Sequence, residues 1–359
     1  MRGRVTPQTS MLTLRTPEQM VRKDHPLRGV KVLADEALKE LEPVFSAMYD
    51  EGGRESIPPE RLLKSSLLIA LFSVRSERLF CEQLDYNMLF RWFLDMALDE
   101  ASFDHSTFSK NRERLMRHEV AAKFFAAVVE QARRRRLLSN EHFSVDGTLL
   151  EAWASMKSFR PKDETKPPEP PDDPGNPTVD FRGEKRSNET HESKTDPDAR
   201  LARKGNGKEA KLCHAAHGVI ENRNGLLVAL TLTAATGRAE IDAAIEMIGA
   251  LGGEGRITLG ADKGYDTHRL VETCRAGAIT PHVAQKKHSA IDARTTRHEG
   301  YATSQRIRKR IEEVWGWLKT IAGFRKTRFR GRERVEHDLT LGSSAYNLLR
   351  IANLVRLAA

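Results

Sequence analysis

The sequence predicts an α/β domain, with a mixed sheet flanked by helices, preceded by an all-α domain. From Val32 to Arg117 apolar residues recur every three or four positions, which is typical of amphipathic helices. Beyond residue 138 short apolar runs alternate with helical patterns, which indicates an α/β sheet. We therefore expect an N-terminal arm at 1–30, a helical domain at 31–138, an α/β domain at 139–350 and a C-terminal tail at 351–359.

The helical domain is expected to contain five main helices. Their patterns cover residues 33–49, 58–74, 79–96 and 104–120, and a further helix ends in the arginines 133–136. Pro58 and Pro59 suit a first helical turn, and Asp104 or Ser106 suits an N-cap. These helices supply enough large apolar side chains for a core of their own.

The α/β domain is expected to open with an antiparallel meander and to continue with strands joined by helices. Strands are expected at 142–148, 211–222, 225–235, 256–265 and 279–284, with helices at 240–251 and 267–277. Residues 156–208 interrupt this pattern because they are dense in Pro, Gly and charge and poor in large apolar side chains. Such a segment cannot offset its ordering entropy, so we expect a flexible, exposed insertion.

The charge of the chain indicates a polyanionic partner. The 359 residues carry a net charge of +9 with a pI near 9.5, and residues 305–334 hold eleven Lys/Arg against three Glu, a net charge of +8. Nucleic acid and an anionic membrane surface both fit this pattern. No apolar run approaches the roughly 20 residues that span a bilayer, so a cytoplasmic protein is expected. Cys81, Cys213 and Cys274 form no CxxC pair and fit reduced thiols in a core.

Two aspartates follow apolar strands in similar settings. In the segment "FSVDGT" Asp146 is expected at the end of an apolar strand, and in "ITLGAD" Asp262 is expected at the end of another. Each has an ordinary alternative reading, since Asp-Gly after a strand is a common hairpin signal and an aspartate often caps a turn. A third carboxylate, Glu312, lies on a later helix inside the most basic part of the chain.

The three carboxylates together favour a metal site. Mg²⁺ prefers carboxylate oxygens, and two such ions stabilise the attacking and leaving oxygens of an in-line phosphoryl displacement. Carboxylates gathered without a cation would repel one another. Both Glu312 and Glu313 flank the apolar side of their helix, so helix geometry alone does not choose between them.

The segments "VDGT", "GADKGYD" and "SQRIRKRIEEVWGWLK", in this order, resemble the catalytic segments of bacterial insertion-sequence DDE transposases of the "IS-five" group, which have an RNase H-like fold. The third segment is the most specific: the family pattern Tyr-x2-Arg-x3-Glu-x6-Lys falls on Gln305, Arg308, Glu312 and Lys319. Gln305 departs from the pattern, and the nearest tyrosine is Tyr301.

The resemblance implies that Asp146, Asp262 and Glu312 are catalytic and bind metal, with Mg²⁺ as the cofactor and Mn²⁺ as a substitute. It further implies cleavage and joining of transposon-end DNA. The expected partners are double-stranded DNA, as element ends and as target, and a second copy of the chain in a dimer or larger assembly. The expected location is the bacterial cytoplasm, at the nucleoid, with no membrane partner.

The basic residues near the third segment are expected to contact DNA. Arg308 and Lys319 bracket Glu312, and the expected phosphate contacts after the helix are Arg325, Lys326, Arg328 and Arg330. Phe324 and Phe329 lie among these arginines and suit stacking on unstacked bases, the alternative being two core phenylalanines under a solvated charged face. The arginines 133–136 are either a second DNA contact or a solvated helix end.

A helix in the N-terminal domain is a second candidate for DNA contact. The segment "STFSKNRERL" would present Ser106, Lys110, Asn111 and Arg114 in the manner of a helix-turn-helix, the alternative being an ordinary amphipathic helix. Three other residues are interpreted as structural. His214 and His217 point to opposite faces of a strand and do not form a zinc site, and Trp315 packs against the sheet.

The sequence therefore predicts a DNA transposase that binds terminal inverted repeats, cleaves DNA and transfers strands. Two alternatives stay open. One is a metal-dependent nuclease of the same fold that cuts without joining, and the other is a non-catalytic DNA-binding protein derived from a transposase.

Overall fold

The computed structural model describes residues 16–49, 56–162, 180–181, 184–205, 207–249, 251 and 255–358. The first helices of the chain are α1 (Pro17–Met20), α2 (Leu27–Glu40), α3 (Glu42–Met48), α4 (Pro59–Leu71), α5 (Glu77–Tyr86), α6 (Met88–Phe93), α7 (Ser106–Arg117) and α8 (Val120–Arg134). The later helices are α9 (Ala239–Gly249), α10 (His268–Ala276), α11 (Ala293–Thr296), α12 (Glu299–Ile307), α13 (Arg310–Thr320) and α14 (Arg332–Ala358). Short 3-10 helices are η1 (Met156–Ser158) and η2 (Lys263–Tyr265). None of the helices in the described ranges is long and apolar enough to cross a membrane.

The central sheet has the strand order β10-β9-β1-β7-β6. β6 pairs with residues 211–213 of β7, and β8 pairs with residues 214–221 of the same strand. Its strands are β1 (His142–Glu151), β6 (Arg200–Ala202), β7 (Lys211–Glu221), β8 (Leu226–Ala234), β9 (Ile257–Ala261) and β10 (Ile279–Val283). β1, β7 and β8 form the expected antiparallel meander, whereas β9 runs parallel to β1 and β10 parallel to β9. The described residues also form two small sheets, β2 (Phe159–Pro161) with β5 (His191–Ser193), and β3 (Asp180–Phe181) with β4 (Glu184–Lys185).

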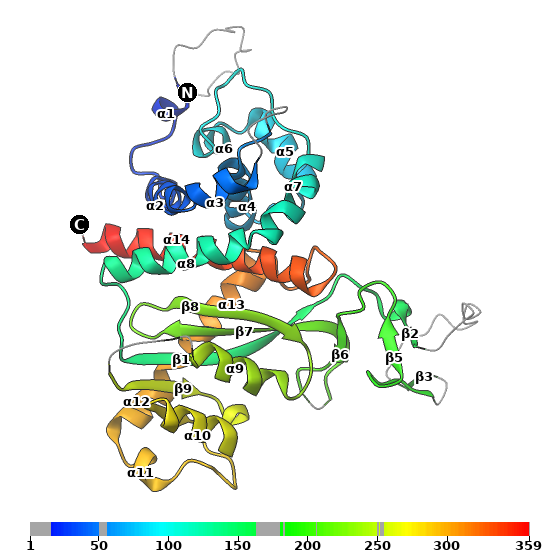
Figure 1. Cartoon of the computed structure of the whole chain (residues 1–359), viewed down its shortest axis with the longest axis vertical. Helices are drawn as coiled ribbons and strands as arrows, with labels where there is room; N and C mark the ends of the chain where they lie inside the picture. The colour runs from blue at the N-terminus through cyan, green and yellow to red at the C-terminus, as the bar shows by residue number, and fades with distance from the viewer. Residues whose placement is uncertain are drawn as a thin grey trace, which may run out of the picture.

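Helices cover both faces of the sheet. α9 and α10 lie on one face, and α13 lies behind it on the other (Figure 1). Alternate residues of β1 follow this division: Phe143 and Val145 pack in the core beneath α9 and α10, while Leu150 packs in the core with α13 and α14. Because successive side chains of a strand point to opposite faces, Ser144, Asp146 and Thr148 lie on the α13 face.

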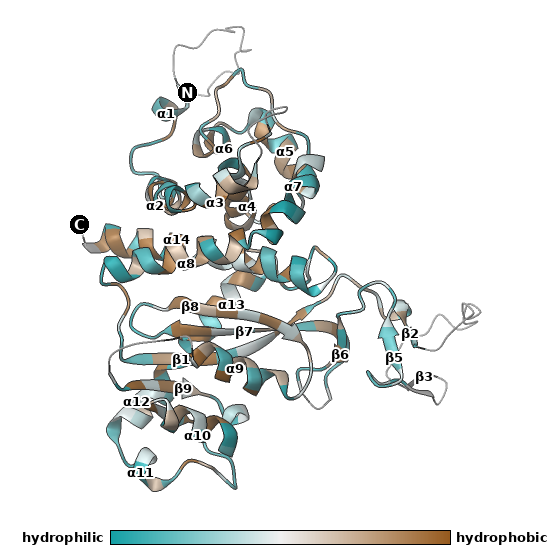
Figure 2. Cartoon of the chain, viewed as in Figure 1, coloured by the Kyte–Doolittle hydropathy of each residue, from teal (hydrophilic) through white to brown (hydrophobic). Residues whose placement is uncertain are grey.

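The last helix joins the two parts of the chain. α14 lies between the N-terminal helices and the sheet (Figure 1) and packs against α2, α4, α8 and β8. Figure 2 shows hydrophobic stretches on the strands and on α14, and one continuous core includes residues from α2, α4, α8, β8 and α14. The expected tail at 351–359 is wrong for its described residues, because they continue α14 and Ile351 is fully buried. The N-terminal arm is also shorter than expected, since Leu27 and Val30 already lie in the core.

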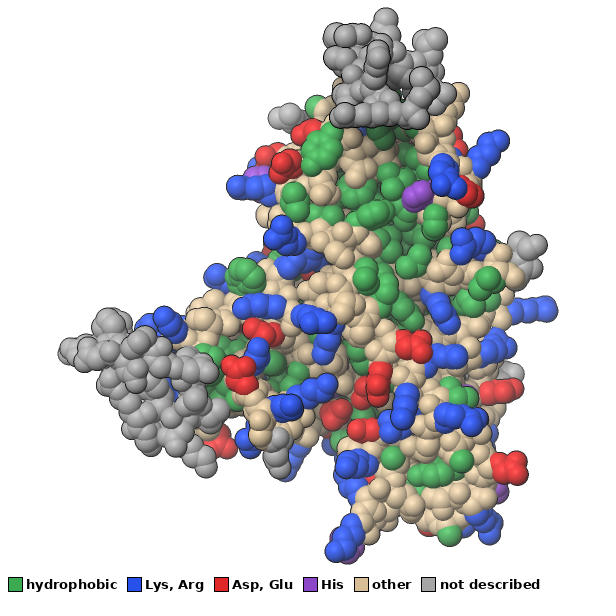
Figure 3. All heavy atoms as spheres, turned by 180° about the vertical axis from the view of Figure 1, so that it is seen from behind, with side chains coloured by type: hydrophobic (Ala, Val, Ile, Leu, Met, Phe, Trp, Pro, Cys, Tyr) green, Lys and Arg blue, Asp and Glu red, His purple; other side chains and the backbone are tan. Residues whose placement is uncertain are grey.

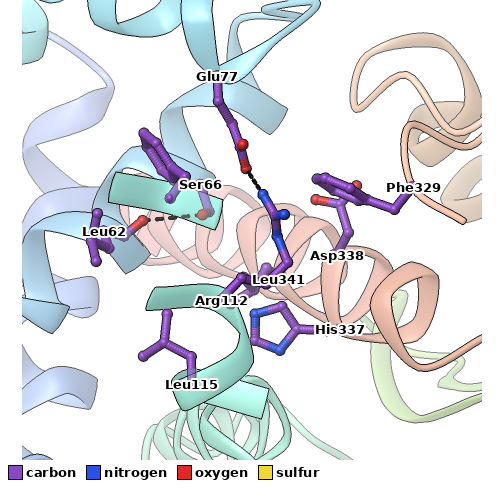
Figure 4. Close-up of a pocket in the computed structure, with 10 residues that line it drawn as sticks. Leu62, Ser66, Glu77, Arg112, Leu115, Phe329, His337, Asp338 and Leu341 are labelled. Carbon is purple, nitrogen blue, oxygen red and sulfur yellow. Dashed lines mark hydrogen bonds and ion pairs between the residues drawn. The ribbon is translucent and has the colours of Figure 1, made fainter. Parts of the chain in front are cut away.

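A cluster at the start of α14 fixes the helical part to the α/β part. Arg112 of α7 points towards Glu77 of α5, and the two form an ion pair (Figure 4). The same guanidinium lies 4.1 Å from the ring centre of Phe329. Arg328 beside it pairs with Asp338 of α14 at 3.0 Å and donates to the carbonyl of Val74. These contacts tie the segment before α14 to α4, α5 and α7.

The expected exposed insertion at 156–208 is partly a packed structure. Phe159 is buried, β6 joins the central sheet, and Asp196 lies fully buried beside His214 of β7. Gly331 and Arg332 donate backbone hydrogen bonds to Asp196 and Asp198, which fixes the segment to the start of α14. The segment is buried through small residues such as Ser193 and Ala199 and through the polar pair of Asp196 with His214. Its lack of large apolar side chains therefore does not make it exposed. Residues 163–179, 182–183 and 206 lie outside the described residues.

Candidate active site on the sheet

Asp146 lies in the middle of β1. The expectation that it ends its strand is wrong, because β1 continues to Glu151 and pairs with β7 along its whole later half. The Asp-Gly pair therefore forms no hairpin. Gly147 is required for another reason: a Cβ atom there would lie 2.9 Å from Glu240 Oε1 and 3.0 Å from His217 Nδ1.

Asp262 lies beside Asp146 at the end of the neighbouring strand. The last paired residues of β1 and β9 are Ser144 and Gly260, and each aspartate follows its strand's last pair by two residues. Adjacent strands lie about 4.8 Å apart, so this register brings the two carboxylates to one edge of the ladder. Asp262 also begins η2, where its side chain accepts a hydrogen bond of 2.6 Å from the backbone N–H of Gly264.

The helix α13 crosses the sheet on the face that carries Asp146. The residue paired with Asp146 is Gly218, and a Cβ atom there would lie 3.1 Å from the ring of Trp315. Trp315 is nearly buried, which confirms that it packs against the sheet. One turn further on, Lys319 Nζ donates a 2.6 Å hydrogen bond to Thr148 Oγ1, two residues beyond Asp146 on the same face.

This packing separates the two glutamates of α13. The negative charge of Glu312 contributes to the raised pKa of Asp146, whereas that of Glu313 acts on the pKa of Tyr346 in α14. Glu312 is therefore the glutamate on the Asp146 side, although both side chains are exposed. The helix does not run unbroken from residue 305, because α12 ends at Ile307 and α13 begins at Arg310.

Arg308 lies in the turn between the two helices, close to β9. A Cβ atom on Gly260 would lie 3.3 Å from the Cβ of Arg308. The Arg308 Nε atom donates to Gln305 Oε1 at 2.9 Å, and Gln305 Nε2 donates to the carbonyl of His282 in β10. Gln305 thus holds Arg308 at the sheet edge, while the nearby Tyr301 donates to the carbonyl of Val283.

The electrostatics of Asp146 fit a cation-binding role. Its pKa is raised to about 7, mainly by burial and in smaller part by the negative charges of Asp262, Glu240 and Glu312, while a hydrogen bond from Gly147 acts in the opposite direction. Carboxylate oxygens that repel one another are the donors that a hard divalent cation favours. Within the described ranges no three His, Cys, Asp or Glu side chains stand close enough to enclose an ion. A metal held by all three carboxylates would therefore require side chains to move, the exposed Glu312 among them.

The sequence did not single out a group of residues on the opposite face. Glu240 begins α9 and lies beside Gly147, and burial raises its pKa. Tyr265 is fully buried, and its pKa is raised by burial and then by the charge of Glu240. Burial lowers the pKa of His217 to about 4, so its ring is neutral at pH 7. No motif marks these residues, because the fold alone brings them near Asp146.

The basic residues after α13 divide into two kinds. Figure 3 views the molecule from the α13 side and shows several acidic side chains near the middle, between Lys and Arg side chains. Arg325, Lys326 and Arg330 are exposed, as DNA contacts would require. Arg328 is not free for DNA, since it is largely buried and paired with Asp338. Phe324 is buried in the core, so the expectation of base stacking by this ring is wrong, and Phe329 packs under Arg112.

The N-terminal candidates are also divided by the structure. On α7 Lys110 is exposed, but Asn111 is buried and donates to the carbonyl of Thr107. The Arg114 guanidinium lies 4.6 Å from the ring centre of Tyr49. Three of the four arginines at 133–136 form ion pairs with glutamates of α8 and α2, namely Glu130, Glu40 and Glu36.

Two histidines of β7 and the three cysteines of the chain are buried and structural. His214 Nε2 lies 3.0 Å from Asp196 Oδ2, and His217 Nε2 lies 2.8 Å from Thr233 Oγ1 on β8. Cys81, Cys213 and Cys274 are free and buried, as the sequence predicted.

Two family models match the chain. Residues 15–114 match the model described as "Transposase domain (DUF772)", and residues 181–348 match the "Transposase DDE domain". The chain belongs to the DDE transposases. The match to the DDE domain includes Asp262 and Glu312 and begins after Asp146. The transposase is therefore a metal-dependent polynucleotidyl transferase, and its predicted RNase H-like fold is confirmed, while the "IS-five" subgroup stays a prediction.

Solved structures add distant likenesses. One is the cryo-EM structure of a piggyBac transposase synaptic complex with hairpin DNA, which has 9% identity and a TM-score of 0.40, over 92% of the transposase chain and 76% of the piggyBac chain. Another is the Mos1 transposase paired-end complex with the left transposon end, which has 13% identity and a TM-score of 0.21, over 80% of the transposase chain and 87% of the Mos1 chain. No curated protein was found to match the sequence.

Proposed function

We propose that this transposase cleaves DNA at the terminal inverted repeats of its element and joins the freed 3′ ends to target DNA. Asp146, Asp262 and Glu312 are proposed to hold the divalent metal ions that the family requires. Mg²⁺ is the proposed ion, with Mn²⁺ as a substitute, since both accept carboxylate oxygens.

One observation carries this assignment. Asp146 and Asp262 follow the last residue pair of β1 and β9 by the same two residues, and α13 crosses the same face with Trp315 over Gly218. The three carboxylates thus come from elements that pack on the same face of the sheet, which supports a shared site, and the raised pKa of Asp146 reflects both burial and its negative neighbours.

The residues around the carboxylates have distinct proposed tasks. Divalent ions stabilise the attacking and leaving oxygens of an in-line phosphodiester displacement. Lys319 is held by Thr148 at the carboxylate face, so its ammonium group can bind a phosphate next to the reacting one. Arg308 is oriented by Gln305 and offers a second, planar cation at the β9 edge. Both residues therefore bind and orient DNA.

The proposed partners follow from the reaction. Two element ends have to be cut and joined together, so we expect a dimer or larger assembly on double-stranded DNA. Lys110 and Arg114 of α7 and the exposed Arg325, Lys326 and Arg330 are the proposed phosphate contacts. The site of action is then the bacterial nucleoid, in the cytoplasm.

Strand transfer is tested with ends that are already cut. Linear DNA carrying the inverted repeats that flank the gene, with free 3′-hydroxyls, is incubated with the transposase, Mg²⁺ and a supercoiled plasmid. Insertion of both ends into the plasmid is the expected result. A nuclease of the same fold would cleave uncut ends in Mg²⁺ but would leave precut ends unjoined, and a non-catalytic DNA-binding protein would do neither.

A further inference from the structure

Trp153 is a half-exposed tryptophan just beyond the end of β1. Its side chain is 50% exposed, although the preceding Ala152 is fully buried. The backbone N–H of Trp153 donates a 3.0 Å hydrogen bond to Thr327 Oγ1, and Thr327 in turn bonds to Glu151 through its backbone. The position of the residue is therefore fixed by the sheet while half of the residue stays exposed to solvent, an arrangement that hydrophobic burial alone does not explain.

Positive charge surrounds this ring. The Lys326 Nζ atom lies 5.6 Å from the Trp153 ring centre. Trp153 and the exposed Arg75 line the same groove of about 260 Å³. The groove also contains Glu77 and Asp338, but Arg112 and Arg328 already neutralise them. The groove therefore offers an aromatic face and the exposed cation of Arg75, with Lys326 beside the ring.

Basic side chains lie on the way from the proposed active site to Trp153. Lys319 binds Thr148, and its pKa is lowered by burial and then by the nearby positive charges of Lys204 and Arg325. Lys326 follows and approaches Glu151, the last residue of β1. The rise from Asp146 to Glu151 along the strand is about 17 Å. A strand of DNA bound at the carboxylates can thus reach the tryptophan within a few nucleotides, along a row of basic side chains.

We propose that Trp153 and Lys326 form a binding site for an unstacked base of the DNA strand that is bound at the carboxylates. The indole stacks on the base, and Lys326 binds the adjacent phosphate. Stacking on an aromatic ring accepts any base, and a basic groove that follows the backbone is the usual companion of such a ring. The placement of this base a few nucleotides from the reacting phosphate rests on the proposed function. The existence of a stacking site at Trp153 does not.

The site is tested by binding without metal. A duplex that carries a single-stranded dT extension is compared with the same duplex with a blunt end. Wild-type transposase is expected to bind the extended duplex more tightly. Trp153→Ala should lower that affinity by about 5- to 150-fold and leave blunt-end binding unchanged, which is the range found for loss of one stacked base. Trp153→Phe should retain most of the affinity because it keeps an aromatic face.

Two controls separate stacking from other effects. Tyr86 at the end of α5 is also exposed, at 65%, so Tyr86→Ala should bind both DNAs as the wild type does. Photocrosslinking of an extension that contains 5-iododeoxyuridine should attach DNA to the peptide that contains Trp153. Equal loss of affinity for both DNAs, or no loss for either, would overturn the proposal.

A protein partner at this surface would give a different result. In that case Trp153→Ala would change the sedimentation of the free transposase and leave its preference for the extended duplex intact, which would also overturn the proposal. The proposed function is tested separately from the stacking site. If the transposase prefers unpaired ends but cleaves no DNA in Mg²⁺, the stacking site is supported and the proposed reaction is contradicted.

Discussion

Asp146 and Asp262 follow the last paired residues of two adjacent parallel strands by the same number of residues. Their neighbourhood is therefore fixed by backbone hydrogen bonds and does not depend on a flexible loop. Glu312 differs, because it lies on an exposed face of a helix. This asymmetry makes the glutamate the more informative residue to change.

Glu312→Gln is expected to abolish metal-dependent cleavage while DNA binding persists. The substitution removes the negative charge of one metal ligand and so weakens metal binding. Cleavage activity should fall by more than the roughly 10- to 100-fold that follows loss of a residue that only supports a metal ligand. Gel assays of cleavage in Mg²⁺, with binding measured in parallel, check this. The matched variant is Glu313→Gln, which should cleave nearly normally because Glu313 faces Tyr346. The reverse outcome for the two variants would mean that α13 presents the other side to the sheet.

The exposed basic residues are expected to control the salt dependence of DNA binding. Alanine at Arg325, Lys326 and Arg330 together should weaken binding and reduce the slope of log K against log salt by up to about three, since each phosphate contact contributes about 0.9. Binding titrations over a range of salt concentrations measure the slope. If the slope is the same in the triple variant, these side chains do not bind phosphates.

Arg328→Ala is the structural counterpart and should act on stability. Arg328 binds Asp338 and the carbonyl of Val74, so its loss leaves a partly buried carboxylate unpaired. The expected cost is about 1 to 3 kcal/mol in the free energy of unfolding, with little change in the salt slope. Urea unfolding measures the first quantity. A variant as stable as the wild type with a lowered slope would place Arg328 on DNA after all.

The Asp196–His214 pair is expected to hold the segment at 187–202 on the sheet. Both side chains are fully buried, so Asp196→Ala leaves a buried partner alone and should cost about 3 to 5 kcal/mol. Limited proteolysis should then cut this segment before the rest of the chain. Glu192 forms an exposed ion pair with Lys194 in the same segment, so Glu192→Ala should change stability by less than about 1 kcal/mol. Rapid proteolysis of the wild type here would contradict the packed arrangement.

The same pair predicts a pH dependence of stability. Burial opposes ionisation of Asp196, but the hydrogen bond and charge of His214 and the backbone N–H groups of Gly331 and Asp198 outweigh it and lower the pKa below 3.8. Because the folded pKa is the lower one, the stabilisation is fully present above the unfolded value and is lost as the pH falls through the folded value. Wild-type stability should therefore decline below about pH 4 more steeply than that of Asp196→Asn. Parallel curves in thermal unfolding from neutral to acid pH would exclude this role.

The sequence predicted the five main strands of the sheet, together with α9 and α10, because each has a clear apolar period, but it did not predict α14. The pairing of β1 with β9 could not be read from the sequence, since register depends on which strands meet. Asp146 was interpreted as a strand end because Asp-Gly usually turns the chain. Gly147 is instead needed inside the strand, because the side chains of Glu240 and His217 leave no room for a Cβ atom at this residue.

The errors elsewhere have a common physical origin. Asp196 is buried by a partner on another strand, so local composition could not reveal that it packs. Arg328 belongs to a basic run, but tertiary contacts with Asp338 and Val74 remove it from solvent. Ile351 looked like part of a tail because its core neighbours are provided by helices from the start of the chain. Each case depends on long-range contacts.

The position of α14 has a consequence for shortened versions of the gene. Its residues complete the core of the N-terminal helices and also cover β8, so both parts of the protein depend on a helix that follows them in the chain. A stop codon before residue 332 would leave both parts of the protein with uncovered apolar surface. Such a gene product would be degraded or would aggregate, and it would not persist as a DNA-binding fragment that competes with the intact transposase for element ends. A truncated copy of the element would therefore be silent and would not act as a repressor.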